Sequence, residues 1–223
     1  IGWMARSVDD IALMAEALTW DERFRRAEDS APPRIGHLRL AEEGQASPAM
    51  HAALDRALNE LSTAGAKVVN VQRPAGFDRL NAAQETIQLF EAARSYITEY
   101  SQHREQLSEK ICGLLDRGRH LSREDYAAAQ EQVALCRIGL VSLFANCDIL
   151  MLPSAPGEAP SGLGATGDPV FNRAATALGN PAITLPFGTG DKGLPLGLQC
   201  WSASDFALLH HARWVEYSLT GKA

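Results

Sequence analysis

The 223-residue sequence has little positive charge and no long apolar run, and each absence excludes a class of function. It contains 21 lysine and arginine residues against 27 aspartate and glutamate residues, which gives a net charge of −6. Nucleic-acid-binding proteins usually carry a basic face, so we expect no nucleic-acid partner. No apolar stretch approaches the roughly 20 residues that a membrane-spanning helix needs, so we expect no membrane association.

The spacings that mark common metal and redox sites are also missing. The four cysteines form no C-x-x-C pair, which is typical of small buried residues in a reducing compartment, so we predict a cytoplasmic protein. The six histidines form no H-E-x-x-H motif. His210 and His211 are adjacent and would point about 100° apart on a helix. We therefore predict no metal and no cofactor.

No motif for an activated nucleophile or a phosphate loop is present. The sequence contains neither G-x-S-x-G nor G-x-x-x-x-G-K-[ST]. Gly162, Gly164 and Gly167 have the spacing G-x-G-x-x-G, but they open no βαβ unit and have prolines on both sides. None of the four lysines stands in an apolar strand end with a serine beside it. The residues alone therefore indicate no complete catalytic constellation.

The sequence does contain a concentration of strand and loop signals between Asp148 and Gln199. Short apolar runs at 149–153, 181–186 and 194–199 are each interrupted by Pro or Gly, and each predicts a buried strand. Turn residues between the last two runs predict an antiparallel pair. The Gly- and Pro-rich segment 154–168, which we call the central loop, follows the first strand. Ligands often bind where strands end, so this region is the candidate site.

The first part of the chain predicts a mixed α/β domain. Ser7 begins a helix whose inward face would include Leu18, and a charged surface connection follows over 21–33. A strand at 34–40, a helix that starts at Ser47-Pro48 and stops at Gly65, and a strand at 67–71 form a βαβ unit. Its two strands are therefore predicted to be parallel.

A long helical excursion is predicted over about 77–146. Its apolar periodicity indicates helices at about 77–101, 104–117 and 123–146, with a break at 117–119. Such an excursion between two strands implies a lobe over one face or edge of the sheet. A short helix ended by Gly179 and a last helix from about Ser204 complete the pattern.

Several segments resemble the amidase signature family, and they occur in that family's order. Residues 2–10 (GWMARSVDD) are similar to its G-P-M-A-R-S-V-x-D, with Trp3 in place of the proline, and residues 148–156 (DILMLPSAP) to its D-x-L-L-x-P-x-x-P. Residues 121–129 look like the helix that precedes this strand. Phe171-Asn172 and the stretches 178–186 and 193–199 resemble F-N…G-x-P-A-I-x-x-P…G-L-P-x-G-L-Q. Together the matches span almost the whole chain.

The resemblance implies an α/β fold with part of a mixed sheet flanked by helices. Residues 1–223 would form a single domain, the C-terminal portion of a larger amidase-like fold. Members of the family cleave carboxamide C–N bonds with a Ser–Ser–Lys triad, but this sequence has no G-G-S-S-G-G motif and no position that matches the triad lysine. We therefore predict no catalytic residue in this chain and no amide hydrolysis by the chain alone.

The resemblance implies that this chain supplies loops that line the pocket for the substrate, a small-molecule amide. The structural alternative is that the two prolines and Gly179 shape strand ends and that Phe171 belongs to the core. The predicted substrate-binding residues are Pro153, Thr166, Gly167, Phe171, Gly179, Asn180 and Pro181.

Two other functions stay open at this stage. One is the amidotransferase subunit of the tRNA-dependent glutaminyl pathway, which belongs to the same family and needs a partner subunit. The other is a non-catalytic binding or scaffold protein. The resemblance covers only part of a fold, which would leave a sheet edge and apolar surface uncovered, so we expect a homodimer or other self-association.

Overall fold

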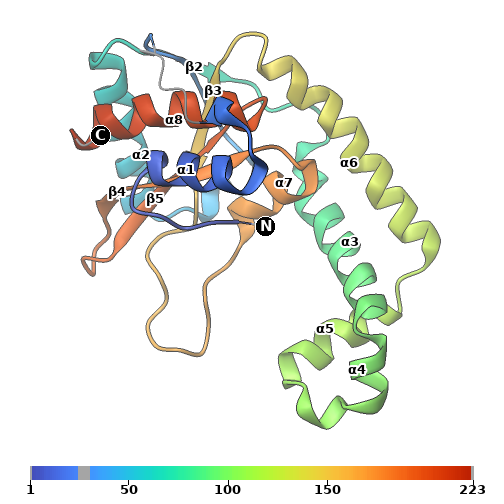
Figure 1. The fold of residues 1–223 in the computed structure, drawn as a ribbon. Coiled ribbons are helices and arrows are strands. Elements are labelled where there is room, and N and C mark those ends of the chain that lie inside the picture. The colour runs from blue at the N-terminus through green and yellow to red at the C-terminus, as the bar shows by residue number, and fades with distance from the viewer. Residues whose placement is uncertain (1, 25–30, 222–223) are drawn as a thin grey trace.

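The computed structural model describes residues 2–24 and 31–221, so residues 25–30 of the predicted surface connection lie outside it. Figure 1 shows a sheet with helices on both faces and a helical lobe extending to one side. The helices and strands are α1 (Val8–Thr19), β1 (Arg34–Leu38), α2 (Pro48–Thr63), β2 (Lys67–Val71), α3 (Leu80–Ser95), α4 (Ile97–Gln102), α5 (Glu109–Arg119), α6 (Arg123–Leu143), β3 (Ile149–Pro153), α7 (Val170–Leu178), β4 (Ala182–Thr189), β5 (Pro195–Trp201) and α8 (Asp205–Thr220). Short 3-10 helices lie at Glu22–Phe24, Ala41–Gln45, Phe77–Arg79 and Arg104–Gln106.

The five strands form one mixed sheet in the order β2-β1-β3-β5-β4. β1 pairs in parallel with both β2 and β3, whereas β5 pairs antiparallel with β3 and β4. The predicted βαβ unit and the predicted antiparallel pair are therefore confirmed. β4 stands at one edge of the sheet, and the candidate site is built around this strand.

The two faces of the sheet carry different helices. The guanidinium of Arg56 in α2 lies 5.3 Å from the centre of the Phe187 ring in β4, so the odd-numbered side chains of β4 face α2. Because side chains alternate along a strand, Ala182 and Thr184 face the opposite side. On that opposite face, Asn172 of α7 is hydrogen-bonded to Gln199 of β5.

The helical lobe, α3–α6, confirms the predicted excursion but divides it differently. The helix predicted at 77–101 is interrupted at Tyr96, whose backbone (φ −97°, ψ 22°) leaves the helical region, so α3 and α4 are separate helices. The predicted start of the third helix is confirmed, because Ser122 and Asp125 form a capping box at the beginning of α6. Figure 1 shows α4 and α5 at the end of the lobe farthest from the sheet.

The prediction of a break at 117–119 is wrong. α5 continues through Arg119, and Gly118 lies inside it. A Cβ atom on Gly118 would stand 2.0 Å from the carbonyl oxygen of Leu89, so the glycine permits α5 to approach the backbone of α3. Gly118, which suggested a helix end in the sequence, is therefore the position where α5 packs closely against α3.

The helix at the start of the chain begins as predicted, with the Ser7 hydroxyl accepting a hydrogen bond from the backbone N–H of Asp10. Val8, Ala12 and Ala15 are buried. The prediction that Leu18 points inward is wrong, because 62% of its surface is exposed. α1 packs mainly on α8, and nothing in the described chain covers the side of the helix on which Leu18 lies.

The cysteines behave as small core residues rather than as a reactive set. Cys136, Cys147 and Cys200 are buried, and Cys112 is partly buried. Complete burial raises the pKa of the Cys200 thiol to about 12, which keeps it protonated. No helix within residues 2–24 and 31–221 combines the length and the apolar character that a membrane span requires.

Candidate functional site

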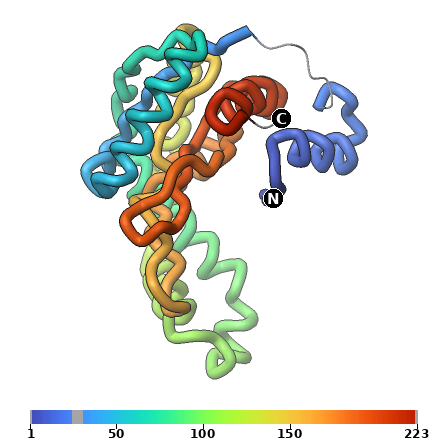
Figure 2. The backbone as a smooth tube through the Cα atoms, turned by 90° about the vertical axis from the view of Figure 1, so that its left-hand side faces the viewer, coloured from blue at the N-terminus to red at the C-terminus, as the bar shows by residue number. Residues whose placement is uncertain are grey.

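A cleft of about 940 Å³ runs along β4 and is the best candidate for a functional site. Residues 2–7, which we call the N-terminal arm, form one wall together with α1 and α8. β4 and the turn 179–181 form the other wall. Figure 2 shows α1 standing apart from the sheet, with α8 between them.

The arm side of the cleft is fixed by contacts between α1 and α8. The carboxylate of Glu216 in α8 accepts a hydrogen bond of 3.0 Å from the backbone N–H of Val8. Arg213 of α8 is paired with Asp9 of α1. A carboxylate at a helix N-terminus satisfies a backbone N–H that has no partner within the helix, and it interacts favourably with the helix dipole. These contacts hold the start of α1 at a set distance from β4.

Three of the predicted substrate-binding residues lie together in the cleft wall. Gly179, Asn180 and Pro181 connect α7 to β4, and Gly179 ends α7 in the left-handed conformation (φ 66°). The Asn180 amide donates a hydrogen bond of 3.1 Å to the carbonyl oxygen of Pro181. Its Oδ1 is buried and has no hydrogen-bond partner within the described residues. Asn180 Oδ1 is therefore an unsatisfied acceptor enclosed within this wall.

The other four predicted residues lie elsewhere. Phe171 is completely buried in the core, as the structural alternative held, and Pro153 is buried at the end of β3 opposite Leu198. Thr166 and Gly167 are exposed in the central loop, where Gly167 has a left-handed backbone (φ 97°). The structure thus brings together 179–181 but not the remaining four, and a role toward substrate stays a prediction for all seven.

A chain of side-chain hydrogen bonds fixes the start of the central loop to the sheet. The Trp201 indole N–H donates to the amide oxygen of Gln199, and the Gln199 amide donates to the side-chain oxygen of Asn172. The Asn172 amide in turn donates to the backbone carbonyl of Ser154 over 3.0 Å. Sequence reasoning noted Asn172 and Gln199 only as parts of motifs. Their spacing of 27 residues gives no local signal that they meet.

Two side chains, those of Glu158 and Lys110, also hold the central loop. The Glu158 carboxylate accepts hydrogen bonds from the backbone N–H groups of Lys192 (3.0 and 3.1 Å) and Leu194 (2.7 Å) in the β4–β5 turn. The Lys110 ammonium of α5 donates to the carbonyl oxygen of Gly164 over 2.6 Å. Glu158 is therefore an anchor for the loop. Asp168, the other acidic residue of the central loop, is exposed.

Asp148 is a structural ion-pair residue rather than a reactive acid. Its carboxylate accepts hydrogen bonds of 2.7 Å from the backbone N–H and from the Nη2 group of Arg34 in β1. The hydrogen bonds from the Arg34 side chain, more than any other interaction, hold the pKa of Asp148 below its ordinary value. The pair ties the start of β3 to the start of β1, away from the cleft.

The described lysines do not form a base for nucleophilic catalysis. Lys67, Lys110 and Lys192 are all exposed, whereas a lysine that acts as a base near neutral pH needs burial or a neighbouring cation to lower its pKa. The fourth lysine, Lys222, lies outside the described residues.

A partly buried group of titratable residues lies near the end of β1 but is not arranged as a metal site. The Glu43 carboxylate is 4.0 Å from Nε2 of His37 and 3.9 Å from Nδ1 of His51. Two ligands of one zinc ion are separated by roughly 3.3 Å. Burial lowers the pKa of His37 and raises the pKa of Glu43, because it disfavours the charged form of each side chain. Within the described part of the chain, no three His, Cys, Asp or Glu side chains are placed to hold a metal ion.

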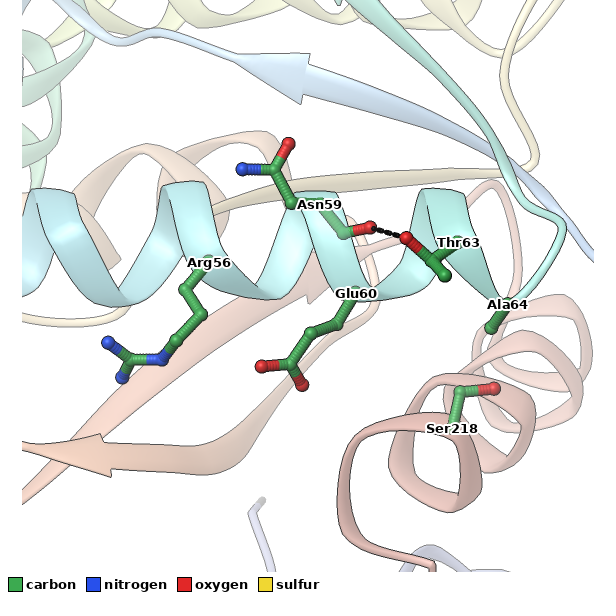
Figure 3. A pocket seen from close by; sticks show the side chains of 6 residues that line it. All are labelled: Arg56, Asn59, Glu60, Thr63, Ala64 and Ser218. Carbon is green, nitrogen blue, oxygen red and sulfur yellow. Dashed lines mark hydrogen bonds between the residues drawn. The ribbon is translucent and has the colours of Figure 1, made fainter.

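A second hollow of about 640 Å³ lies between α2 and the end of α8. Figure 3 shows Arg56 and Glu60 projecting from one side of α2, and Ser218 on α8 opposite Ala64. Arg56 is engaged with the Phe187 ring, and the hollow is open to solvent. It offers no buried polar group toward a ligand, so the cleft along β4 is the stronger candidate.

Comparison with known proteins assigns the chain to a protein family. A family model described as Amidase matches residues 1–205. A 2-amino-5-chloromuconic acid deaminase from Comamonas testosteroni is 25% identical over 89% of this chain and 46% of the relative. A glutamyl-tRNA(Gln) amidotransferase subunit from Neisseria meningitidis is 37% identical, over 33% of this chain and 17% of the relative. The chain thus spans less than half the length of these curated relatives.

Solved structures show the same relationship in three dimensions. A crystal structure of an amidase matches with a TM-score of 0.86 and 26% identity, over 96% of this chain and 52% of the amidase. The fold of a 6-aminohexanoate cyclic dimer hydrolase matches with a TM-score of 0.78 at 22% identity, over 97% of this chain and 54% of that one. These matches confirm the predicted fold class of a mixed sheet flanked by helices.

Sequence reasoning missed the arm side of the cleft. The segment 2–10 was noted for its resemblance to a motif, but it suggested no contact with residues 179–186. The sequence feature that could have pointed to the arm is the family resemblance, because the arm and the turn 179–181 both lie in stretches that resemble family motifs. The resemblance does not show that these two stretches face each other across one cleft, because that arrangement depends on the packing of α1 against α8.

Proposed function

The chain belongs to the amidase family, and we propose that it supplies the substrate-facing wall of an enzyme that hydrolyses a carboxamide C–N bond. The match to the family model over residues 1–205 carries this proposal. The cleft supports it, because its wall combines apolar side chains with a buried polar acceptor, Oδ1 of Asn180. Such a site suits a small amide, whose carbon skeleton is buried while an N–H group is hydrogen-bonded.

The chemistry of amide cleavage requires groups that these 223 residues do not combine. A nucleophile must be activated by a base, and the tetrahedral intermediate needs donors for its oxyanion. No G-G-S-S-G-G motif is present, and the described lysines are exposed. We therefore propose that the nucleophile and base come from outside this sequence. The turn 179–181 and the central loop would then select and orient the substrate.

An activity comparison tests the proposal. The 223-residue chain and a protein that also includes the coding sequence upstream in the same reading frame are assayed with a broad set of aliphatic and aromatic amides. We expect turnover only with the longer protein, together with a Gly/Ser-rich motif and a lysine in the added residues. Robust turnover by the short chain would contradict the proposed division of roles, and an upstream stop codon would remove the enzymatic proposal.

Self-association is a second part of the proposal that remains to be measured. Without the rest of an amidase fold, the edge of β4 and the apolar side chains exposed on α1, Leu13 and Leu18, would be open to solvent, and such surfaces tend to associate. We expect light scattering of the 223-residue chain to show a dimer or larger species. A stable monomer would count against this expectation.

The second candidate function is that of an amidotransferase subunit. The 37% identity to the Neisseria meningitidis amidotransferase favours it, although that match covers 33% of this chain. Co-purification of the longer protein with further subunits, and glutamine-dependent transfer instead of simple hydrolysis, would support this candidate. Hydrolysis of small amides by a protein that purifies alone would favour the amidase.

A further inference from the structure

We propose that Ser154, Asn172 and Thr184, which we call the polar strip, form a subsite for a neutral polar group of the substrate beside the cleft along β4. The inference rests on the proposed function and adds a substrate class to it. That class is amides that carry a second carbonyl or hydroxyl oxygen, rather than plain aliphatic amides. Thr184 lines the cleft, and the other two residues continue from it along the sheet.

The polar strip lies on one face of the sheet, beside α7. Thr184 pairs with Gln199 across β4 and β5, so their side chains share a face. Asn172 of α7 is bonded to Gln199 on that face. A Cβ atom on Gly197 would overlap Oγ of Ser154 and stand 2.7 Å from Cγ2 of Thr184. The lack of a side chain at Gly197 therefore allows the Ser154 and Thr184 side chains to meet above β5.

The hydrogen-bond chain from Trp201 fixes which group Asn172 presents. An indole N–H can only donate, so the Gln199 oxygen faces Trp201 and the Gln199 NH₂ group faces Asn172. The Asn172 oxygen then accepts from Gln199, and its NH₂ group donates one N–H to the carbonyl oxygen of Ser154. The second N–H of Asn172 is left for a ligand. The strip thus presents a donor, which calls for an oxygen acceptor on the substrate.

The buried residues behind Asn172 hold this donor in place. Trp201 is 0% and Gln199 is 3% exposed, whereas Asn172 itself is exposed. Turning the Asn172 amide would leave buried polar atoms of this chain unsatisfied, so the network resists reorientation. An exposed amide that is already fixed loses little conformational freedom when it binds a ligand. This separates Asn172 from the freely rotating polar side chains of an ordinary surface.

The hydroxyl groups of Ser154 and Thr184 add donors and acceptors beside the Asn172 amide. Within the described part of the chain, neither hydroxyl forms a hydrogen bond with another residue. Both residues are placed by their backbones instead. The Ser154 N–H donates to the carbonyl oxygen of Gly197 over 3.1 Å, and Thr184 belongs to the ladder between β4 and β5. Because a hydroxyl both donates and accepts, the strip matches a carboxamide or an alcohol.

The charges around the polar strip exclude an ionised substituent. The eight residues of β4 carry no charged side chain. The one charged residue of α7, Arg173, donates a hydrogen bond to Gln84. Burying a charge costs much more than burying a neutral polar group unless the charge is paired. The strip therefore favours a neutral group over a carboxylate or an ammonium group.

Binding of four amides of similar length to the 223-residue chain tests the proposal without turnover. Succinamide carries a second carboxamide, butyramide a methyl group, succinamate a carboxylate and γ-aminobutyramide an ammonium group. Each is titrated while amide signals are followed by NMR, including the side-chain NH₂ signals of Asn172. We expect succinamide to bind at least about 10-fold more tightly than the other three, with shifts at Asn172 and Thr184.

The outcomes separate this inference from the proposed function. Succinamide binding that is absent, no tighter than that of butyramide, or confined to other parts of the chain would overturn the polar strip. Tighter binding of γ-aminobutyramide would also overturn it and would point to a carboxylate such as Asp168. A chain that hydrolyses no amide can still bind succinamide here. Conversely, a longer protein that cleaves butyramide as efficiently as succinamide would support the amidase and contradict the strip.

Two variants remove ligand groups without removing a hydrogen bond of the folded protein. Ser154→Ala and Thr184→Val each delete a hydroxyl that has no partner within the described residues. We expect unchanged unfolding curves and succinamide binding that is weaker by about 3- to 10-fold. Asn59→Leu, at an exposed amide in the hollow between α2 and α8, is the control and should leave binding unchanged. Weaker binding by Asn59→Leu alone would place succinamide in that hollow and contradict the proposal.

Asn172→Asp tests the outward donor directly. The variant keeps the shape of the side chain but replaces the NH₂ group by a carboxylate oxygen, which only accepts. We expect succinamide to bind about 10-fold more weakly, and γ-aminobutyramide to bind more tightly than it does to the native protein. A residue that only supported the central loop would not reverse the preference between the two probes. Equal weakening of both probes would contradict a contact between Asn172 and the ligand.

Discussion

Arg137 in α6 donates from Nε to the carbonyl oxygen of Leu178 over 2.8 Å, at the last residue of α7. Its Nη2 donates to the carbonyl oxygen of Ala177 over 3.0 Å. The last carbonyls of a helix have no partners within it, and a guanidinium there also interacts favourably with the helix dipole. The helical lobe is thus joined to the residue that precedes the cleft turn 179–181.

Replacement of Arg137 should loosen this turn. Arg137→Met keeps most of the apolar stem but leaves both carbonyl oxygens to water, at a cost of roughly 1 kcal/mol. We expect faster hydrogen exchange at Gly179, whose N–H bonds to Ala175, with little change in β1 or β3. Arg137→Lys keeps the charge and should show a smaller effect. Uniformly faster exchange throughout the chain would point to a general loss of stability instead.

Removal of the Glu158 carboxylate should free the central loop from the β4–β5 turn. Glu158→Ala leaves the N–H groups of Lys192 and Leu194 without their acceptor, and we expect a loss of about 1 kcal/mol of unfolding free energy. Limited proteolysis within 154–168 should become faster. Asp168→Ala, in the same loop but exposed, is the matched control and should leave cleavage unchanged. Equal cleavage of the two variants would contradict the anchoring role.

Two glycines of α5 should respond oppositely to alanine. Gly118→Ala places a Cβ against the backbone of Leu89 and the side chain of Ala93, and overpacking of this kind costs roughly 1–3 kcal/mol. Gly113→Ala, in the same helix but with no atom within 4 Å of the new Cβ, should stabilise the protein by up to about 1 kcal/mol. Urea unfolding of both variants measures the difference. A neutral Gly118→Ala would refute the close approach of α3 and α5.

The Arg34–Asp148 pair should make stability depend on pH in a defined direction. Because Arg34 lowers the pKa of Asp148 in the folded state, the ionised carboxylate stabilises the protein above the unfolded-state pKa of about 3.9. This contribution is lost as the pH falls through the folded-state pKa. Asp148→Asn should therefore cost roughly 1–2 kcal/mol near neutral pH.

The cost of Asp148→Asn should shrink at low pH, where the native carboxyl is also protonated. Urea unfolding of the native protein and the variant, at intervals from about pH 7 down to about pH 3, measures the gap. Asp10→Asn is a suitable control, because Asp10 pairs with the exposed Arg6 on the surface. A gap that stays constant with pH would show that the side chain acts through shape rather than charge.

Most elements could be predicted because their signals are local. Ser7, Ser47, Ser122 and Ser204 each cap the helix that follows them, and Gly179 ends α7 in the left-handed conformation. These interactions involve neighbours within a few residues, so they can be recognised in the sequence. The predictions at Gly118 and Leu18 were wrong because both depend on tertiary contacts. Gly118 packs against α3, and Leu18 lies on a side of α1 that no other described element covers, and sequence periodicity indicates neither.

The candidate site was only half predictable for the same reason. Gly179, Asn180 and Pro181 lie between a recognisable helix and a recognisable strand, so their place at a strand end followed from the pattern. The opposite wall, residues 2–7, is more than 170 positions away and reaches the cleft through the contacts of Val8 with Glu216 and of Asp9 with Arg213. No local rule connects those pairs.

The sequence by itself determined most of the elements, their order, the parallel pairing of β1 with β2, the antiparallel pairing of β4 with β5 and the family resemblance, because caps, turns and apolar periodicity act over short distances. Only the tertiary structure decided that Phe171 is core, that Glu158 anchors a loop, and that β4 lies at an edge of the sheet. These facts depend on which distant segments pack together. That packing is set by the burial of side chains from the whole chain at once.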